Sequence, residues 1–134
     1  MALLLALTLN LKQKDSLTRD VPRGWEIKAG YNGLGLVGRT LGIVGFGNIG
    51  SEVARLAAPF DLELIAFDPH VTDEKIKAQG VRSVGLDELF RQSDIVTLNC
   101  PLNDSTRHLV NSQRLAMMKP GSYLINTALS LIHI

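Results

Sequence analysis

The residues of this chain best suited to bind a phosphate are three glycines, Gly45, Gly47 and Gly50, spaced Gly-x-Gly-x-x-Gly. The apolar residues 41–44 before them predict a strand buried on both faces, and apolar positions from Ile49 to Ala57 recur at helical spacing. In such a unit, Gly45 turns the chain, Gly47 lets the backbone approach a pyrophosphate, and Gly50 packs the helix on the strand. The helix N-terminus adds free N–H groups and a positive dipole end. This order of elements predicts a dinucleotide-binding βαβ unit.

A second glycine triplet, Gly33, Gly35 and Gly38, has the same spacing in a different context. No apolar strand precedes it, and the segment that follows has the composition of a strand rather than a helix. Because glycine spacing alone is weak evidence for a nucleotide site, we interpret this triplet as a coincidence in a loop.

An acidic residue, Asp68, directly follows the second apolar run, residues 62–67. A carboxylate at this position of a βαβ unit accepts hydrogen bonds from the adenosine ribose and repels a 2′-phosphate, so we predict NAD rather than NADP as the cofactor. No arginine follows Asp68 to bind a 2′-phosphate; Pro69 and His70 occupy these positions. We interpret His70 as a solvated loop residue rather than a catalyst.

The second wall of the predicted site consists of Asn99, Cys100 and Pro101, which follow a buried strand expected at residues 95–98. The wall should flank the adenosine half, because ligands bind outside the carboxyl ends of parallel strands. Cys100 has two interpretations, a nucleophile or a small apolar wall residue. The second is favoured, since no histidine lies at a spacing that would pair with the thiol.

From residue 40 onward the strand and helix patterns alternate, which predicts an α/β fold with a parallel sheet and right-handed crossovers. Strands are expected at residues 41–44, 62–67, 81–84, 95–98 and 122–126, with helices at 49–57, 72–78 and 112–118 and another from residue 87. A doubly wound order 3-2-1-4-5 puts the Gly45 turn at the switch point where ligands bind. Such sheets have more strands than these, so we expect this one to be incomplete at its C-terminal side. Residues 2–14 predict one helix.

The 134 residues carry a net charge of +1, with lysines and arginines spread out and balanced by acids. This balance argues against a nucleic-acid partner. A single cysteine excludes an internal disulfide framework and a cysteine metal cluster, and it fits a reducing compartment, so we expect a cytoplasmic protein. The apolar residues 1–9 lack the basic start and cleavage site of a signal peptide and are too short to span a membrane.

Several further motifs resemble the nucleotide-binding domain of the D-isomer-specific 2-hydroxyacid dehydrogenases, a family that includes phosphoglycerate dehydrogenases. The resemblance covers about residues 2–128. Its motifs are GRTLGIVGFGNIG at 38–50, FDP at 67–69, LDELF with SD within 86–94, PL with STRHLV within 101–110, MKPG at 118–121 and LINTA at 124–128. Together they are far more specific than the glycines alone.

This resemblance implies a Rossmann-like domain that binds NAD and serves hydride transfer at the CH–OH group of a D-2-hydroxy acid, with a phosphoglycerate-like substrate among those considered. It implies no metal. The cofactor-binding residues that it implies are Gly45, Phe46, Gly47, Asn48, Ile49, Gly50, Asp68, Pro69, Asn99, Cys100, Pro101, Thr106, Asn126, Thr127 and Ala128.

The resemblance also divides the chain. Residues 1–14 resemble the remnant of an interdomain helix, residues 15–39 with Trp25 an arm in a homodimer contact, and residues 40–128 a partial NAD-binding domain. In the family a substrate-binding arginine comes directly after the Asn-Thr-Ala motif, but this position is Leu129, and the family's glutamate and histidine match no residue here. We therefore expect no catalytic residue in this chain and no activity of the chain alone.

The last six residues, 129–134, match nothing in the family pattern. The codons CTG-TCT-CTT-ATA-CAC-ATC would encode them, and this is the end sequence of a widely used transposase sequencing adapter. We therefore expect residues 129–134 to be a non-native tail on a truncated fragment, and we assign no role to His133.

Two other classes of protein share the glycine motif and Asp68. One is a non-catalytic NAD-sensing or corepressor-type module, which this sequence does not separate from the dehydrogenases. The other is a different NAD-binding Rossmann enzyme, such as S-adenosylhomocysteine hydrolase. The motifs at residues 105–108 and 118–121 fit the 2-hydroxyacid family better than the latter.

Overall fold

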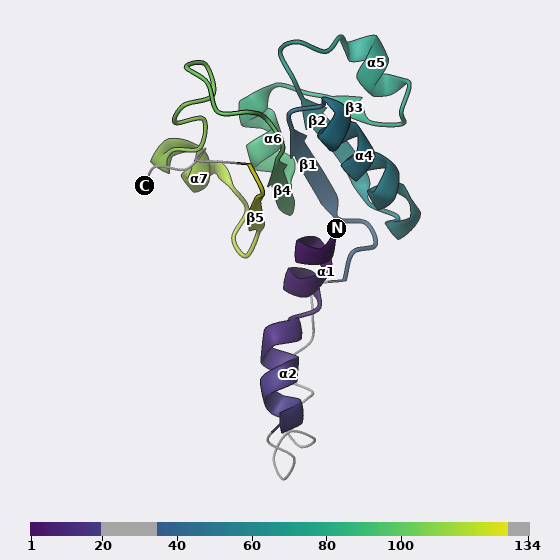
Figure 1. The fold of residues 1–134 in the computed structure, drawn as a ribbon, viewed down its shortest axis with the longest axis vertical. Helices are drawn as coiled ribbons and strands as arrows, with labels where there is room; N and C mark the ends of the chain where they lie inside the picture. The colour runs from purple at the N-terminus through teal and green to yellow at the C-terminus, as the bar shows by residue number, and fades with distance from the viewer. Residues whose placement is uncertain (20–34, 129–134) are drawn as a thin grey trace. The chain divides into compact units, whose positions relative to one another are not determined.

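The computed structural model describes residues 1–19 and 35–128, which fall into two units, Met1–Leu36 and Val37–Ile134. The first unit carries α1 (Ala2–Thr8) and α2 (Leu11–Arg19). The second carries β1 (Thr40–Val44), α4 (Asn48–Ala57), η2 (Ala58–Phe60), β2 (Glu63–Phe67), α5 (Asp73–Lys77), β3 (Arg82–Ser83), α6 (Leu86–Gln92), β4 (Ile95–Leu98), α7 (Ser112–Met117) and β5 (Tyr123–Asn126) (Figure 1). No helix in the described ranges is both long and apolar enough to cross a membrane. Trp25 and the tail from Leu129 lie outside the described residues.

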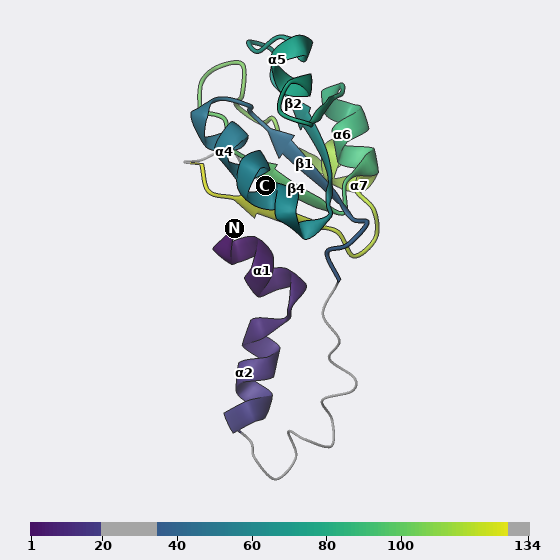
Figure 2. The same ribbon diagram turned by 90° about the vertical axis from the view of Figure 1, so that its right-hand side faces the viewer.

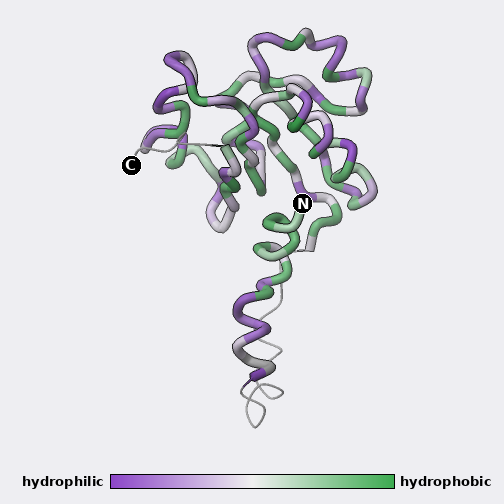
Figure 3. Tube along the Cα trace, viewed as in Figure 1, coloured by the Kyte–Doolittle hydropathy of each residue, from purple (hydrophilic) through white to green (hydrophobic). Residues whose placement is uncertain are grey.

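The prediction of one helix over residues 2–14 is wrong, because α1 ends at Thr8 and a separate helix, α2, begins at Leu11. Asn10 takes a left-handed conformation there, with φ of 52°, which asparagine tolerates better than most other non-glycine residues. Its N–H donates to the Leu7 carbonyl (3.2 Å), and its own carbonyl accepts from the Lys14 N–H (3.0 Å) at the start of α2. Figure 3 shows that α1 is mainly hydrophobic and α2 mainly hydrophilic, so the two helices have different surfaces.

The second unit contains a five-stranded parallel sheet in the order β3-β2-β1-β4-β5, which confirms the predicted doubly wound topology. The central strand β1 is buried along its whole length, as its continuous apolar run predicts. The strands and helices of this unit begin and end within one residue of the expected positions. Of the second glycine triplet, Gly35 and Gly38 are described, and they precede β1 in a loop, as expected for a coincidental match.

Helices cover both faces of this sheet. Figure 2 shows α4 on one face and α6 with α7 on the other. This arrangement follows from right-handed crossovers, because the chain moves outward from β1 through β2 to β3 and then crosses to β4 and β5 on the other side of β1. The carboxyl ends of β1, β2 and β4 therefore meet at one edge, next to the turn that begins at Gly45.

Gly42, in the middle of β1, sets how closely α6 packs on the sheet. A Cβ at this position would overlap Ser93 Oγ and approach Leu89 Cγ to 2.9 Å. Leu89 belongs to the buried core of this unit together with Val44, Ile65, Phe90, Val96 and Leu98. Glycine at residue 42 therefore lets α6 pack closely on β1.

At the opposite, amino-terminal edge of the sheet, Asp94 holds three strands together. Its Oδ2 accepts from the Thr40 N–H (2.9 Å) at the start of β1 and from Lys119 Nζ (3.2 Å), and its Oδ1 lies 3.5 Å from Arg39 Nη1. Its backbone carbonyl accepts from the Tyr123 N–H (2.9 Å) at the start of β5. Burial tends to raise the pKa of Asp94, but the Thr40 bond and the two cations outweigh it and hold the pKa below its usual value.

Candidate functional site

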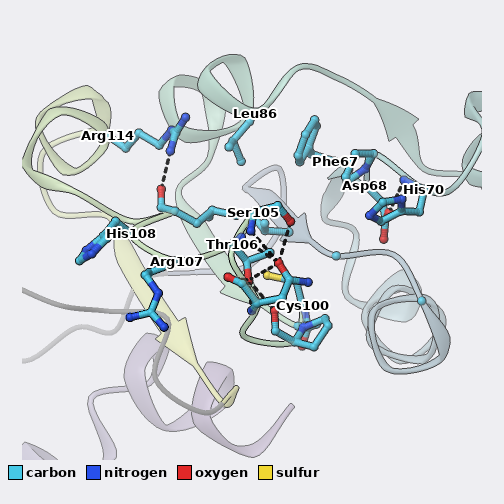
Figure 4. Close-up of a pocket in the computed structure, with 18 residues that line it drawn as sticks. Phe67, Asp68, His70, Leu86, Cys100, Ser105, Thr106, Arg107, His108 and Arg114 are labelled. Atoms are coloured by element: carbon cyan, nitrogen blue, oxygen red, sulfur yellow. Dashed lines mark hydrogen bonds between the residues drawn. The ribbon is translucent and has the colours of Figure 1, made fainter.

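A cavity of about 450 Å³ opens at the carboxyl ends of β1, β2 and β4 (Figure 4). Its walls come from the glycine loop after β1, from residues 67–70 after β2, and from the segment that follows β4. These are the three segments that the sequence pattern places around a dinucleotide. The structure thus brings together Gly45, Gly47, Asp68, Pro69, Asn99, Cys100, Pro101 and Thr106 from the expected set.

Gly45 is required by both its conformation and its surroundings. Its φ of 88° lies in the left-handed region, and a Cβ there would come within 2.8 Å of the Cys100 backbone nitrogen. Its N–H donates to the Phe67 carbonyl (2.9 Å) at the end of β2. The turn off β1 therefore packs directly against the segments that follow both neighbouring strands.

Gly47 differs from Gly45 because no protein atom occupies the space where its side chain would lie. It caps the N-terminus of α4 with a φ of −76°, and a Cβ added there would meet no heavy atom within 4 Å. The space beside it adjoins the free N–H groups of a ten-residue helix, which is the arrangement that binds phosphate. Gly50 is packed more tightly, since a Cβ there would overlap the Gly45 carbonyl oxygen.

The Asp68 carboxylate is held beside the glycine loop by two backbone groups. Its Oδ2 accepts from the Phe46 N–H (2.7 Å) and its Oδ1 from the His70 N–H (2.8 Å). Each oxygen of a carboxylate has two acceptor positions, so both oxygens retain capacity for a ribose hydroxyl. The sequence pattern predicts the place of Asp68 but not its bond to Phe46, which ties the end of β2 to the loop after β1.

Cys100 lies half-buried in the cavity wall. Burial raises the pKa of its thiol by more than a backbone hydrogen bond lowers it, and the negative charge of Asp68 raises it slightly further. A thiol with a raised pKa is neutral at physiological pH and is a poor nucleophile. This favours the interpretation of Cys100 as a small wall residue.

The wall segment, residues 101–110, forms the side of the cavity that follows β4. Asn103 Oδ1 accepts from the backbone N–H groups of Ser105 and Thr106, each at 3.0 Å. The Thr106 hydroxyl accepts from the Asn103 N–H (2.8 Å) and donates to the Pro101 carbonyl (2.7 Å). Thr106 therefore shapes the wall through bonds within the segment itself.

Some expected residues lie outside the cavity. Asn48 and Ile49 are exposed on the first turn of α4, and Ile49 is 66% exposed. Phe46 reaches the site only through its N–H bond to Asp68, and the buried Gly50 acts through its packing. Asn126, Thr127 and Ala128 follow β5 and do not line this cavity; Asn126 Oδ1 accepts from the Ala128 N–H (3.0 Å).

Other cavity residues were not expected from the sequence. The apolar ones are Val44, Phe67, Leu86 and Leu109, and the polar ones are His70, Asn103, Ser105, Arg107, His108 and Arg114. Of these, His70 was considered and set aside as a solvated residue, and it is exposed. For Arg114 a usable signal was Asn111, a helix-capping residue that precedes α7 and places Arg114 at the third residue of that helix.

Fold and site together define an NAD-binding domain of the doubly wound α/β class. The family model described as "D-isomer specific 2-hydroxyacid dehydrogenase, NAD binding domain" matches residues 1–131, and the chain belongs to this family. NAD is therefore its cofactor, as Asp68 predicts.

The chain is similar to hydroxypyruvate reductase of Thermotoga maritima, with 46% identity over 104 residues, which cover 78% of the chain and 33% of that protein. It is 35% identical to D-3-phosphoglycerate dehydrogenase of Methanocaldococcus jannaschii over 130 residues, covering 96% of the chain and 24% of that protein.

Among solved structures, the D-lactate dehydrogenase of Aquifex aeolicus complexed with NAD and lactic acid has a TM-score of 0.87 and 34% identity, covering 95% of the chain and 37% of that structure. Salmonella D-lactate dehydrogenase has a TM-score of 0.87 and 32% identity, and the match covers 98% of this chain and 39% of that structure. The chain thus spans from 24% to 39% of the length of these relatives. Their names include three different substrates, so no particular 2-hydroxy acid is singled out.

Proposed function

We propose that the cavity at the carboxyl ends of β1, β2 and β4 binds the adenosine half of NAD. Asp68 is the residue on which this proposal chiefly depends, because its carboxylate lies 2.7 Å from the Phe46 N–H within the glycine loop. In this position it accepts from the ribose hydroxyls while the pyrophosphate lies beside Gly47 at the N-terminus of α4. Phe46, Asn48, Ile49 and Gly50 complete the loop.

The remaining assigned residues form the sides of the site. Pro69 lies beyond Asp68 on one side, and Asn99, Cys100, Pro101 and Thr106 lie on the other, where an adenine ring would pack. We assign Asn126, Thr127 and Ala128 to the part of the cleft that follows β5. Bound NAD supplies a hydride acceptor or donor; the residues named here bind and orient it and exclude water from it.

The binding of NAD serves hydride transfer at the CH–OH group of a D-2-hydroxy acid in this proposal. Hydroxypyruvate and 3-phosphoglycerate in the names of similar proteins support a small, anionic substrate. We further propose that residues 1–14, interrupted at Asn10, are the remnant of an interdomain helical segment. In the same proposal residues 15–39 belong to a homodimer contact, residues 40–128 to the NAD-binding domain, and residues 129–134 to a non-native tail.

Titration of the chain with NADH, followed by nicotinamide fluorescence, tests the binding. We expect saturable binding that ADP-ribose displaces. Reduced nicotinamide mononucleotide, which lacks the adenosine half, should bind at least about tenfold more weakly, because the described cavity contacts that half. Equal affinity for NADH and the mononucleotide would contradict the proposed orientation, and no saturable NADH binding would contradict the proposal itself.

A further inference from the structure

The wall segment, residues 101–110, carries much of the cavity surface but contains neither a helix nor a strand of the sheet order. Its first half is held by the Asn103 and Thr106 bonds within the segment. Its second half ends at Leu109 and Val110, which are buried in the core. Between them the backbone turns twice, with the Arg107 N–H donating to the Asn103 carbonyl (2.8 Å) and the Leu109 N–H to the Thr106 carbonyl (3.1 Å). The Leu109 carbonyl at the end of the segment makes a contact with a neighbouring helix.

Arg114 supplies this contact from α7. Its Nη1 donates to the Leu109 carbonyl at 2.7 Å, and its Nε donates to Asp87 Oδ1 at 3.1 Å on α6. Figure 4 shows Arg114 above the wall, with its bond to the Leu109 carbonyl drawn as a dashed line. One guanidinium thus joins α7, the wall segment and α6.

The backbone of Arg114 is itself fixed. Its N–H donates to Asn111 Oδ1 (2.9 Å), which caps the N-terminus of α7. The Arg114 side chain is 27% exposed and Asp87 is 49% exposed, so the ion pair alone contributes little to stability. The hydrogen bond to the Leu109 carbonyl is the contact that holds the wall segment. A planar guanidinium can donate to two acceptors in fixed directions, so the bond to Asp87 orients the group toward this carbonyl.

We infer that Arg114 is a positioning residue for NAD: it fixes the wall segment against which the adenosine half packs. This inference rests on the proposed function, since it takes the cavity to be the adenosine site. Arg114 acts through Leu109 and the wall rather than by touching a phosphate. Removing the Arg114 side chain should therefore loosen the wall. It should weaken the binding of every ligand that carries adenosine by a similar factor.

The test compares Arg114→Gln and Arg114→Lys with Arg91→Gln in the full chain. Arg91 is an exposed arginine in the last turn of α6 that does not line the cavity, so its replacement makes the same charge change elsewhere. Hydrogen exchange of the wall amides is measured without ligand, and dissociation constants are measured for NADH, AMP and adenosine. Urea unfolding confirms that each variant is folded under the binding conditions.

For Arg114→Gln we expect faster exchange confined to the wall and a rise of about fivefold in all three dissociation constants, the size of one lost hydrogen bond. Arg114→Lys keeps the charge and one donor and should recover part of the affinity. Arg91→Gln should change neither the hydrogen exchange of the wall nor the dissociation constants. A role in stability alone would lower the urea midpoint and leave the dissociation constants of the folded chain unchanged.

Unchanged exchange in the wall of Arg114→Gln would overturn the inference, as would unchanged dissociation constants. A loss of affinity for AMP and NADH but not for adenosine would also overturn it, because it would indicate direct contact with phosphate. Failure of the unsubstituted chain to bind NADH contradicts the proposed function instead. In that case the exchange measurement still decides whether Arg114 fixes the wall segment.

Discussion

Gly45 and Gly47 lie two residues apart and differ in what they require of the chain. Gly45 has a φ of 88° and touches the backbone after β4, whereas Gly47 has an ordinary φ and open space around it. The first glycine is therefore needed for the fold, and we propose that the second is needed for the ligand. Substituting each by alanine separates these two requirements.

We expect Gly45→Ala to lower the free energy of unfolding by about 1–3 kcal/mol, the cost of a strained left-handed residue, with the overlap at Cys100 added. Gly47→Ala should change stability by less than about 1 kcal/mol. It should nevertheless raise the dissociation constant of NADH roughly tenfold, because its methyl group takes the space of the pyrophosphate. Urea unfolding and NADH titration measure the two effects. Equal stability losses in both variants would contradict this division.

Asp68 should determine the preference for NAD over NADP. Its charge repels a 2′-phosphate by about 1 kcal/mol at a separation of about 4 Å in water, so Asp68→Asn should lower the ratio of the NADPH and NADH dissociation constants roughly fivefold. Both constants are measured by fluorescence titration of the same folded preparation. An unchanged ratio would show that the carboxylate does not face the 2′ position.

Residue spacing alone predicted the Gly45 turn and the nearby carboxylate, because both follow from where strands end. The bond between Asp68 and the Phe46 N–H joins residues 22 apart, and that between Arg114 and Asp87 joins residues 27 apart. Such contacts depend on the direction of side chains across neighbouring elements. No local periodicity specifies that direction.

Among the elements, α7 depends most on a single side chain. It has only six residues, and Asn111 Oδ1 caps its first turn by accepting from the Arg114 N–H at 2.9 Å. Asn111→Ala should lower the free energy of unfolding by about 1 kcal/mol, as expected for loss of an N-cap. Asn111→Asp keeps an acceptor and should be close to the unsubstituted chain. Urea unfolding of the three proteins checks this, and equal losses for Ala and Asp would rule out the capping role.

The elements of the sheet were predictable because buried parallel strands appear as continuous apolar runs. The break between α1 and α2 was not, since residues 2–14 contain no proline or glycine and Asn10 is a moderate helix residue. Asparagine tolerates both the helical and the left-handed conformation, and no residue pattern in the segment distinguishes the two. This is the physical reason for the error at that position.

At the scale of the whole sheet, Asp94 links the amino-terminal ends of β1, β4 and β5 and should make stability dependent on pH. Its pKa in the folded chain is lowered, so its contribution is present above the unfolded pKa of about 3.9 and is lost as the pH falls through the folded pKa. We expect the thermal midpoint to fall more steeply below about pH 4 in the unsubstituted chain than in Asp94→Asn. Parallel pH profiles of the two proteins would contradict this.

At the scale of the whole molecule, we propose that NAD occupies the cavity at the carboxyl ends of β1, β2 and β4. Backbone amide chemical shifts of the isotope-labelled chain, recorded by NMR during titration with NAD, test it most directly. We expect the largest changes on residues 45–50, on Asp68 and His70, and on Cys100 and the wall segment, with little change at Asp94 on the opposite edge. Changes centred elsewhere, or no saturable change, would contradict it.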